Sequence, residues 1–244
     1  MYLSMSVKIP VGHIHPLSQM IAEINQIFAT IGFEFAEGPE RELIKFNFDL
    51  LNVPKDHPSR DMQDTFYLTD NPESVMRTHT SPVQVRYMQS HQPPIKMICP
   101  GKVFRNEATD ATHEAQFFQL EGLWIDTDVS LGHMKGVLEY FFSEFFGGEV
   151  QVRFRPSFFP FVEPGVEVDM MIARNDTNKL SGKWIEIMGG GMVHPSVIEG
   201  AGLDASKYQG FAFGMGVDRL AVLKYGIDDI RLMYNGDLRF VTQF

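Results

Sequence analysis

The stretch Phe104-Arg-Asn-Glu107, the polar loop 108–114 and the run Ala115-Gln-Phe-Phe-Gln-Leu-Glu-Gly122 decide the fold. Two strand-like runs joined by a short polar loop are typical of an antiparallel hairpin. Side chains alternate between the two faces of a strand, so Arg105 and Glu107 share one face of the first run. One face of the second run carries three side chains of mixed chemistry, Phe117, Gln119 and Glu121.

This mixed face combines a cation, two carboxylates, an amide and an aromatic ring. A solvated sheet face with cross-strand ion pairs would account for the charges, but the ring should avoid water. The alternative is a platform on which the arginine meets a phosphate, the carboxylates meet an ammonium or a base edge, and the ring stacks. Such a platform suits a nucleotide together with an amino acid. On the opposite face, Phe118, Leu120 and, beyond the glycine, Leu123 are predicted to join the core.

Elsewhere the pattern predicts four helices and several strands. Apolar residues at Leu17, Met20, Ile24 and Phe28 predict a helix over 17–31. Further helices are expected from Pro82, with Ser81 and Gln84 spaced as a capping box, and over about 130–146 and 217–225. Strand-like runs lie at 33–35, 95–99, 102–107, 116–125, 150–155, 167–172, 183–188 and 210–213. Strand–helix–strand alternations are too few for a doubly wound parallel sheet, so we expect one α+β domain.

Composition excludes several classes of protein. The 244 residues carry 21 Lys and Arg against 31 Asp and Glu, a net charge of −10, which argues against a surface that grips nucleic acid throughout. The single cysteine excludes an internal disulfide and a multi-cysteine zinc site. No apolar run approaches a membrane span, the N-terminal MYLSMSVKIP lacks the pattern of a signal peptide, and we expect a soluble, cytoplasmic protein.

Two later segments could also form part of a ligand site. In 210–219, Gly214 and Gly216 would let a ligand approach a strand, and the helix that follows would present Arg219 in its first turn. Glycines for tight packing and an arginine in a surface ion pair explain this segment equally well. In 155–162, Phe159 and Phe161 fall on the same side of an extended segment. They form either ordinary core or the wall of a pocket for an aromatic ring.

Three of these patterns resemble the signature motifs of class II aminoacyl-tRNA synthetases. They are the helix–strand–proline stretch at 17–39, the Phe-Arg-x-Glu at 104–107 and the Gly-x-Gly-x-x-Arg at 214–219. Longer stretches, between His15 and the C-terminus, are similar to the alpha-subunit family of bacterial phenylalanyl-tRNA synthetases: 77–82, 110–113, 119–122, 153–161, 191–195 and 210–219. The resemblance implies an antiparallel sheet of about six strands flanked by helices, activation of phenylalanine by ATP to the adenylate, and transfer to the 3′ end of tRNA(Phe).

The resemblance also implies roles for individual residues. The implied catalytic residues are Arg105, Arg219 and His113. The residues implied to bind phenylalanine are His79, Ser81, Gln84, Gln119, Glu121, Phe159, Phe161, Val162 and Ala212. Those implied to bind ATP are Arg105, Glu107, His113, Phe117, Gly214, Gly216 and Arg219, with Phe117 and Arg219 on either side of the adenine. Mg²⁺ is the implied cofactor, with Glu186 as its candidate ligand. Gln84 is also the capping-box glutamine, and the sequence does not separate its two roles.

The family works as an αβ heterotetramer, so a beta subunit and tRNA(Phe) are the implied partners. Two features depart from the family pattern. The sequence has no heptad run for the N-terminal coiled-coil arm, so we expect a single catalytic domain over 1–244 without that arm. Phe118 stands where bacterial relatives often have histidine.

Two other hypotheses remain open. One is a non-catalytic descendant that binds an amino acid or a partner protein, although Arg105 and Arg219 together argue against it. The other is an enzyme acting on a different amino acid, with Phe159 and Phe161 merely core.

Overall fold

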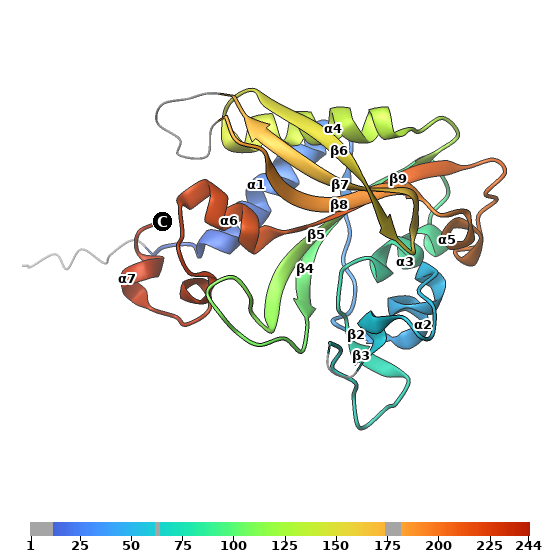
Figure 1. Ribbon diagram of the computed structural model, residues 1–244, viewed down its shortest axis with the longest axis horizontal. Helices are drawn as coiled ribbons and strands as arrows, with labels where there is room; N and C mark the ends of the chain where they lie inside the picture. Colours follow the sequence, from blue (N-terminus) through green and yellow to red (C-terminus); the bar gives the residue numbers. More distant parts are fainter. Residues whose placement is uncertain (1–11, 62–63, 174–181) are drawn as a thin grey trace, which may run out of the picture.

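One large sheet organises the chain in the computed structural model, which describes residues 12–61, 64–173 and 182–244 (Figure 1). The N-terminal MYLSMSVKIP, which lacks the pattern of a signal peptide, lies outside the described residues. The sheet has the strand order β1-β4-β5-β9-β8-β7-β6. Its strands are β1 (Glu34–Phe35), β4 (Ile95–Phe104), β5 (Gln116–Asp126), β6 (Val150–Phe159), β7 (Val162–Ile172), β8 (Ile185–Val193) and β9 (Gln209–Gly216). All neighbours pair antiparallel except β1, which runs parallel to β4.

The α+β class is therefore confirmed, with seven strands in this sheet rather than about six. A separate pair, β2 (Arg41–Leu43) and β3 (Ser74–Met76), lies beside it. The helices are α1 (Pro16–Thr30), α2 (Ile44–Asn47), α3 (Pro82–Ser90), α4 (Leu131–Phe146), α5 (Pro195–Gly200), α6 (Val217–Tyr225) and α7 (Leu238–Val241). Short 3₁₀ turns lie at Asp49–Leu51, Pro58–Arg60 and Ile230–Met233. No helix in the described ranges is long and apolar enough to cross a membrane.

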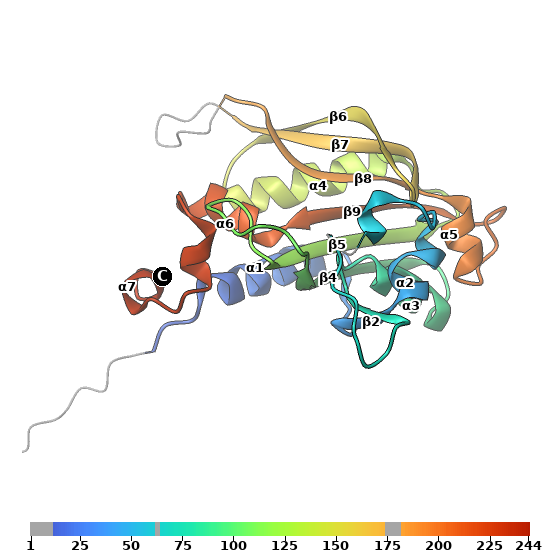
Figure 2. The ribbon, with the colours of Figure 1, turned by 60° about the horizontal axis from the view of Figure 1, so that its bottom comes forward.

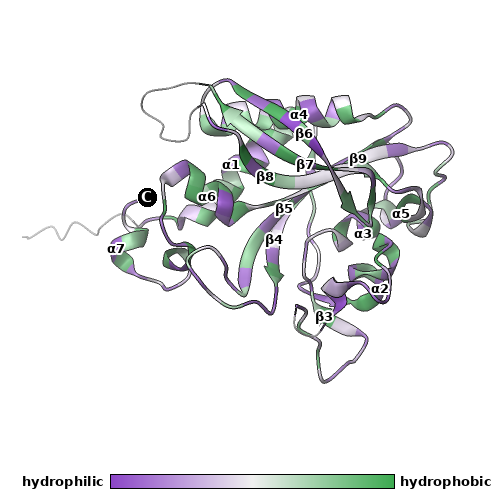
Figure 3. Cartoon of the chain, viewed as in Figure 1, coloured by the Kyte–Doolittle hydropathy of each residue, from purple (hydrophilic) through white to green (hydrophobic). Residues whose placement is uncertain are grey.

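Helices α1, α4 and α6 cover one face of the sheet (Figure 2). The predicted stripe of α1 is buried there, and the Phe28 ring stacks on Phe141 of α4 at a centroid distance of 4.8 Å and on Phe213 of β9 at 6.0 Å. Figure 3 shows both green and purple turns on α4, as an amphipathic helix requires. Gly147 ends this helix in the left-handed conformation at φ 70°, which glycine adopts without strain.

Helices α2, α3 and α5 form a second apolar cluster with the other face of β4, β5 and β9. Leu123 belongs to this cluster, packed with Ala212, and the prediction that it joins Leu120 on the first face is wrong. The β4–β5 register runs without a bulge through Gly122, so residues 119, 121 and 123 keep the same side.

The two runs predicted at 95–99 and 102–107 are one strand, β4, which continues through Pro100 and ends at Phe104. Strand β1 pairs only with Met97 and Ile98, so β4 is an edge strand at Pro100. An edge tolerates a residue without an N–H donor. Because the strand ends at Phe104, Arg105 and Glu107 lie just beyond it and not on a strand face as predicted.

Candidate active site

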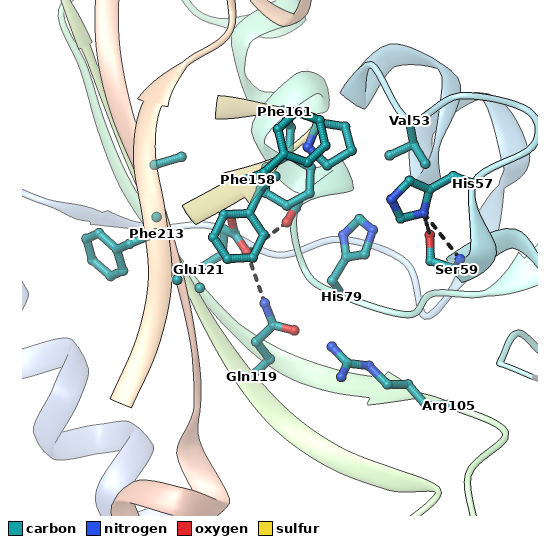
Figure 4. A pocket seen from close by; sticks show the side chains of 17 residues that line it. Val53, His57, Ser59, His79, Arg105, Gln119, Glu121, Phe158, Phe161 and Phe213 are labelled. Carbon is teal, nitrogen blue, oxygen red and sulfur yellow. Dashed lines mark hydrogen bonds between the residues drawn. The ribbon is translucent and has the colours of Figure 1, made fainter. Parts of the chain in front are cut away.

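A cavity of about 320 Å³ opens on the sheet face opposite α1 and α4 (Figure 4). Strand alternation builds it, because Phe211 and Phe213 of β9 bury their rings in the first core while Ala212 and Gly214 line the cavity. The structure brings nine of the sequence-predicted residues to its wall: His79, Ser81, Arg105, Gln119, Glu121, Phe159, Phe161, Ala212 and Gly214. They come from four separate parts of the chain, 79–81, 105–121, 159–161 and 212–214.

The polar floor of this cavity is Glu121, whose side chain is 2% exposed. Its carboxylate accepts hydrogen bonds from Ser81 Oγ at 3.0 Å, Gln119 Nε2 at 3.3 Å, Thr80 Oγ1 at 3.4 Å and Gln84 Nε2. Burial raises the pKa of Glu121 to about 8, although the four donors act in the opposite direction. The Glu121 carboxyl group therefore tends to hold its proton in the empty cavity, and a cationic ligand beside it would favour the ionised form.

Gln84 and Ser81 serve this carboxylate rather than the helix. The predicted capping box is wrong, because Ser81 makes no side-chain cap on α3 and both side chains donate to Glu121 instead. Gln84 is 2% exposed and does not line the cavity, so it acts from behind Glu121. The structure therefore separates the two roles that the sequence leaves joined for Gln84.

Two buried polar atoms at this cavity have no hydrogen-bond partner, His79 Nδ1 and Gln119 Oε1. Burial of the ring and the nearby Arg105 lower the pKa of His79 to about 3, so the imidazole is neutral near pH 7. Buried polar atoms are nearly always satisfied in proteins. Unpartnered ones at a cavity wall are consistent with a polar ligand that completes them.

The apolar end of the cavity is an aromatic wall. The rings of Phe159 and Phe161 stack with centroids 6.0 Å apart, and the wall continues to His79, 6.2 Å from Phe161. Gly189 makes room for this wall, because a Cβ there would lie 2.7 Å from Phe159 Cζ. Val162 is 3% exposed and packs in the second apolar cluster without lining the cavity. Ala212 lines the same cavity as this wall, so this end of the cavity is apolar.

A second cavity, of about 500 Å³, adjoins the first at Arg105, which lines both. Six of the seven residues assigned to ATP line it: Arg105, Glu107, His113, Phe117, Gly216 and Arg219. Arg105 is fixed by a hydrogen bond from Nε to the carbonyl of Thr78 at 3.2 Å, and its guanidinium carbon lies 5.1 Å from the Phe117 ring centroid.

Arg219 and His113 line this second cavity from two different elements, helix α6 and the loop between β4 and β5. Arg219, in the first turn of α6, donates from Nη2 to the carbonyl of Glu186 at 2.8 Å. His113 is exposed in the loop after β4 and contacts Asp110 at 3.1 Å. Gly214, to which the resemblance assigned a role in ATP binding, lies instead in the first cavity, where a Cβ would come within 2.6 Å of Gln119 Nε2.

Glu186, the candidate metal ligand, lines neither cavity. Its carboxylate pairs with Arg155 Nη2 at 2.8 Å. Among the described residues no group of three or more His, Cys, Asp or Glu side chains could hold a metal ion. Mg²⁺ is commonly held by one or two carboxylates together with substrate phosphates. These residues fit a metal bound chiefly by phosphates and not one caged by protein.

Several lining residues had no signal in the sequence. His57 and Ser59 belong to the polar segment 52–65, where nothing distinguishes them from a solvated loop. Phe158 is 81% exposed and lines the cavity together with Phe159 and Phe161. The second cavity is also lined by Asp218 and by residues after α6, including Ile227 and Ile230. The signal available for Asp218 was its place as an acidic residue directly before Arg219.

Known proteins are similar to this chain in sequence and in fold. The sequence profile of a family described as "tRNA synthetases class II core domain (F)" matches residues 3–244. Proteins named phenylalanine–tRNA ligase alpha subunit, from Exiguobacterium sp. and Bacillus subtilis, are 54% and 52% identical over 238 and 242 residues. The alignments cover 96% and 97% of this chain and 69% and 70% of those relatives. This chain belongs to the phenylalanine–tRNA ligase alpha-subunit family.

The family resemblance seen in the sequence motifs is thereby confirmed. A solved structure, pyrrolysyl-tRNA synthetase from Desulfitobacterium hafniense, superimposes with a TM-score of 0.69 at 17% identity. The superposition covers 91% of this chain and 74% of that one. It confirms the class II synthetase fold expected for this chain.

Proposed function

We propose that this chain activates L-phenylalanine with ATP to phenylalanyl-adenylate and, with a beta subunit, transfers phenylalanine to the 3′ end of tRNA(Phe). The observation that carries the proposal is the junction of two cavities at Arg105. One cavity joins a carboxylate floor to an aromatic wall, and the other is lined by a ring, an acid and basic side chains. The names of the relatives support the same reaction.

In the first cavity, we assign the ammonium of phenylalanine to Glu121 and Gln119, and its carboxylate to the side of Arg105 and His79. Its ring lies against Phe159 and Phe161. The apolar end selects against tyrosine, because an unpaired buried hydroxyl costs roughly 1–3 kcal/mol. Ala212 sets the room beyond the ring. Ser81 and Gln84 orient Glu121, and Val162 supports the aromatic wall from behind.

In the second cavity, we assign the adenine to the space between Phe117 and Arg219 and its amino edge to Glu107. His113 faces the outer phosphates. Gly216 lets the nucleotide approach the backbone at the end of β9. Gly214 acts in the first cavity, where it leaves space for Gln119.

The chemistry follows from this placement. A carboxylate oxygen of phenylalanine attacks the α-phosphorus, a P–O bond forms, and the bond to the β-phosphate oxygen breaks, so pyrophosphate leaves. The amino acid is already ionised at its carboxylate, so no general base is required. Arg105 and Arg219 stabilise the negative charge on the non-bridging oxygens, and the junction aligns the two reactants.

We propose Mg²⁺ as the cofactor, because a divalent cation neutralises phosphate charge in such reactions. Glu186 is the proposed carboxylate ligand. Its ion pair with Arg155 would have to break for the carboxylate to reach the metal. We also propose that residues 1–244 form a single catalytic domain, which depends on a beta subunit for transfer to tRNA(Phe).

Pyrophosphate exchange tests the proposal, with a beta subunit supplied and a panel of amino acids compared. Phenylalanine is expected to drive exchange. Exchange driven by another amino acid alone would reassign the substrate. A thermal-shift titration that shows binding of phenylalanine but no binding of ATP would support the non-catalytic hypothesis instead.

A further inference from the structure

A buried carboxylate at the edge of the second cavity has no role in the site described so far. Asp218 is the second residue of α6 and is 4% exposed. Its Oδ2 accepts the backbone N–H of Phe118 at 2.7 Å, and its Oδ1 accepts the hydroxyl of Tyr234. One carboxylate therefore joins a strand, a helix and the segment that follows the helix.

The hydrogen bond to Phe118 continues the sheet where the strands part. The β5–β9 pairing ends at Gln119 opposite Gly216, after which the chain turns into α6. Phe118 precedes Gln119 in β5, so its N–H has no partner from β9. Asp218 supplies the acceptor instead. This bond fixes the first turn of α6 against the N-terminal part of β5.

The hydrogen bond between Asp218 and Phe118 also fixes the distance between the two sides of the nucleotide cavity. Phe117 is the chain neighbour of Phe118, and Arg219 is the chain neighbour of Asp218; both line the cavity. A flat ring between them needs contact on both faces. Dispersion contact falls by a quarter to a half when a gap opens by about 0.5–1 Å. A small change in the β5–α6 distance would therefore weaken binding of a stacked base.

Tyr234 brings the chain after α6 into the same arrangement. Within this segment, the N–H of Ile230 donates to the carbonyl of Ala111 at 3.1 Å, and the carbonyl of Met233 accepts from His15 Nε2 at 2.9 Å. Residues 230–234 thus contact the loop after β4 and the start of α1. The Tyr234 hydroxyl links this segment to Asp218.

We propose that Asp218 is a positioning residue for the nucleotide and that Tyr234 holds it in place. The pair sets the separation of Phe117 and Arg219, so ATP affinity depends on the docking of residues 230–234. This inference rests on the proposed function, in which the second cavity holds ATP. Asp218 acts through its neighbours and does not itself contact the base.

Tyr234→Phe is the decisive variant, because it removes one hydroxyl and keeps the ring. We expect the Kd for ATP, measured by calorimetry without phenylalanine, to rise about fivefold to tenfold. In pyrophosphate exchange, the KM for ATP should rise equally and the KM for phenylalanine should stay within twofold. The value of kcat should fall by less than the KM for ATP rises, because Arg105 keeps its place. Tyr225→Phe, the same change on α6 at a ring packed against Phe244, is the matched control and should leave all of these values unchanged.

Variants of Asp218 distinguish positioning from direct contact. Asp218→Asn keeps a carbonyl oxygen for the Phe118 N–H and should recover most of the ATP affinity lost in Asp218→Ala. Wild-type ATP affinity in Tyr234→Phe, with a loss in Asp218→Ala, would overturn the proposal in favour of direct contact. An equal rise of both KM values with a lowered melting temperature would overturn it in favour of general stability. Wild-type chain that binds ATP but exchanges no pyrophosphate with a beta subunit supplied would refute the proposed function, while the Kd comparison would still decide this inference.

Discussion

Binding of phenylalanine should depend on pH through Glu121. Burial raises the pKa of this carboxyl to about 8 in the free site, so about 9% of molecules carry the carboxylate at pH 7 and about half at pH 8. If the ammonium binds the ionised form, the apparent affinity equals the intrinsic affinity multiplied by that fraction. The Kd for phenylalanine should therefore fall about fivefold between pH 7 and pH 8.

Isothermal titration calorimetry measures both this dependence and its cause. At pH 7, binding should release about 0.9 proton, seen as a dependence of the heat on the ionisation enthalpy of the buffer. His79 has its pKa near 3 and stays neutral throughout, so it contributes no proton. Glu121→Gln should bind phenylalanine more weakly, with no pH dependence and no proton release. The wild-type affinity for ATP, measured over the same pH range, should change much less and is the internal control.

The same group affects stability with a defined sign. Its folded pKa of about 8 lies above the ordinary pKa of 4.5 for a glutamate, so the folded state holds the extra proton between these pH values. Wild-type stability should fall as pH rises through that window, by at most about 5 kcal/mol for 3.5 pKa units. Glu121→Gln should lack this fall in urea denaturation. An affinity that is constant from pH 6.5 to 8, or a slope kept in Glu121→Gln, would refute the reasoning.

Four further predictions concern other parts of the chain. Arg105→Ala should lower the rate of pyrophosphate exchange by about 10²–10³, the loss expected for a donor to transition-state charge; a change under threefold would make the arginine structural. Ala212→Gly should admit ring-substituted phenylalanines in exchange assays, and unchanged selectivity would contradict the pocket assignment. Gly214→Ala should raise the KM for phenylalanine about tenfold without changing that for ATP, because the new methyl displaces Gln119. Leu138→Ala, fully buried on α4, should lower the free energy of unfolding in urea by about 2–5 kcal/mol, and a loss under 1 kcal/mol would place it outside the core.

Local patterns were sufficient for the helices that build the core. The stripe on α1, the glycines after α4 and α6, and the phenylalanines of α4 all predicted elements close to their observed bounds. These signals are read within one turn or one strand, where sequence neighbours are also spatial neighbours. The alternation on β5 likewise placed Gln119 and Glu121 on one face.

Prediction failed where the deciding partner is far along the chain. Gln84 fits a local capping box, yet it donates to Glu121, 37 residues away. Asp218 had no predicted role, because the backbone N–H that it binds belongs to Phe118, 100 residues earlier. The split of β4 at Pro100 was expected from local propensity, and the pairing with β5 overrides it. Such partners are known only once the fold brings the strands together.

The arrangement around Glu121 explains why a synthetase site tolerates a buried acid. Four donors orient the carboxylate, but they leave it short of a countercharge, so the empty site holds a proton near pH 7. The bound ammonium would supply that countercharge inside the cavity, where its attraction is stronger than in water. A ligand that lacks the ammonium meets a neutral acid and gains nothing from this floor. Selectivity for an amino acid over a plain aromatic acid thus has the same origin as the instability of the empty site at high pH.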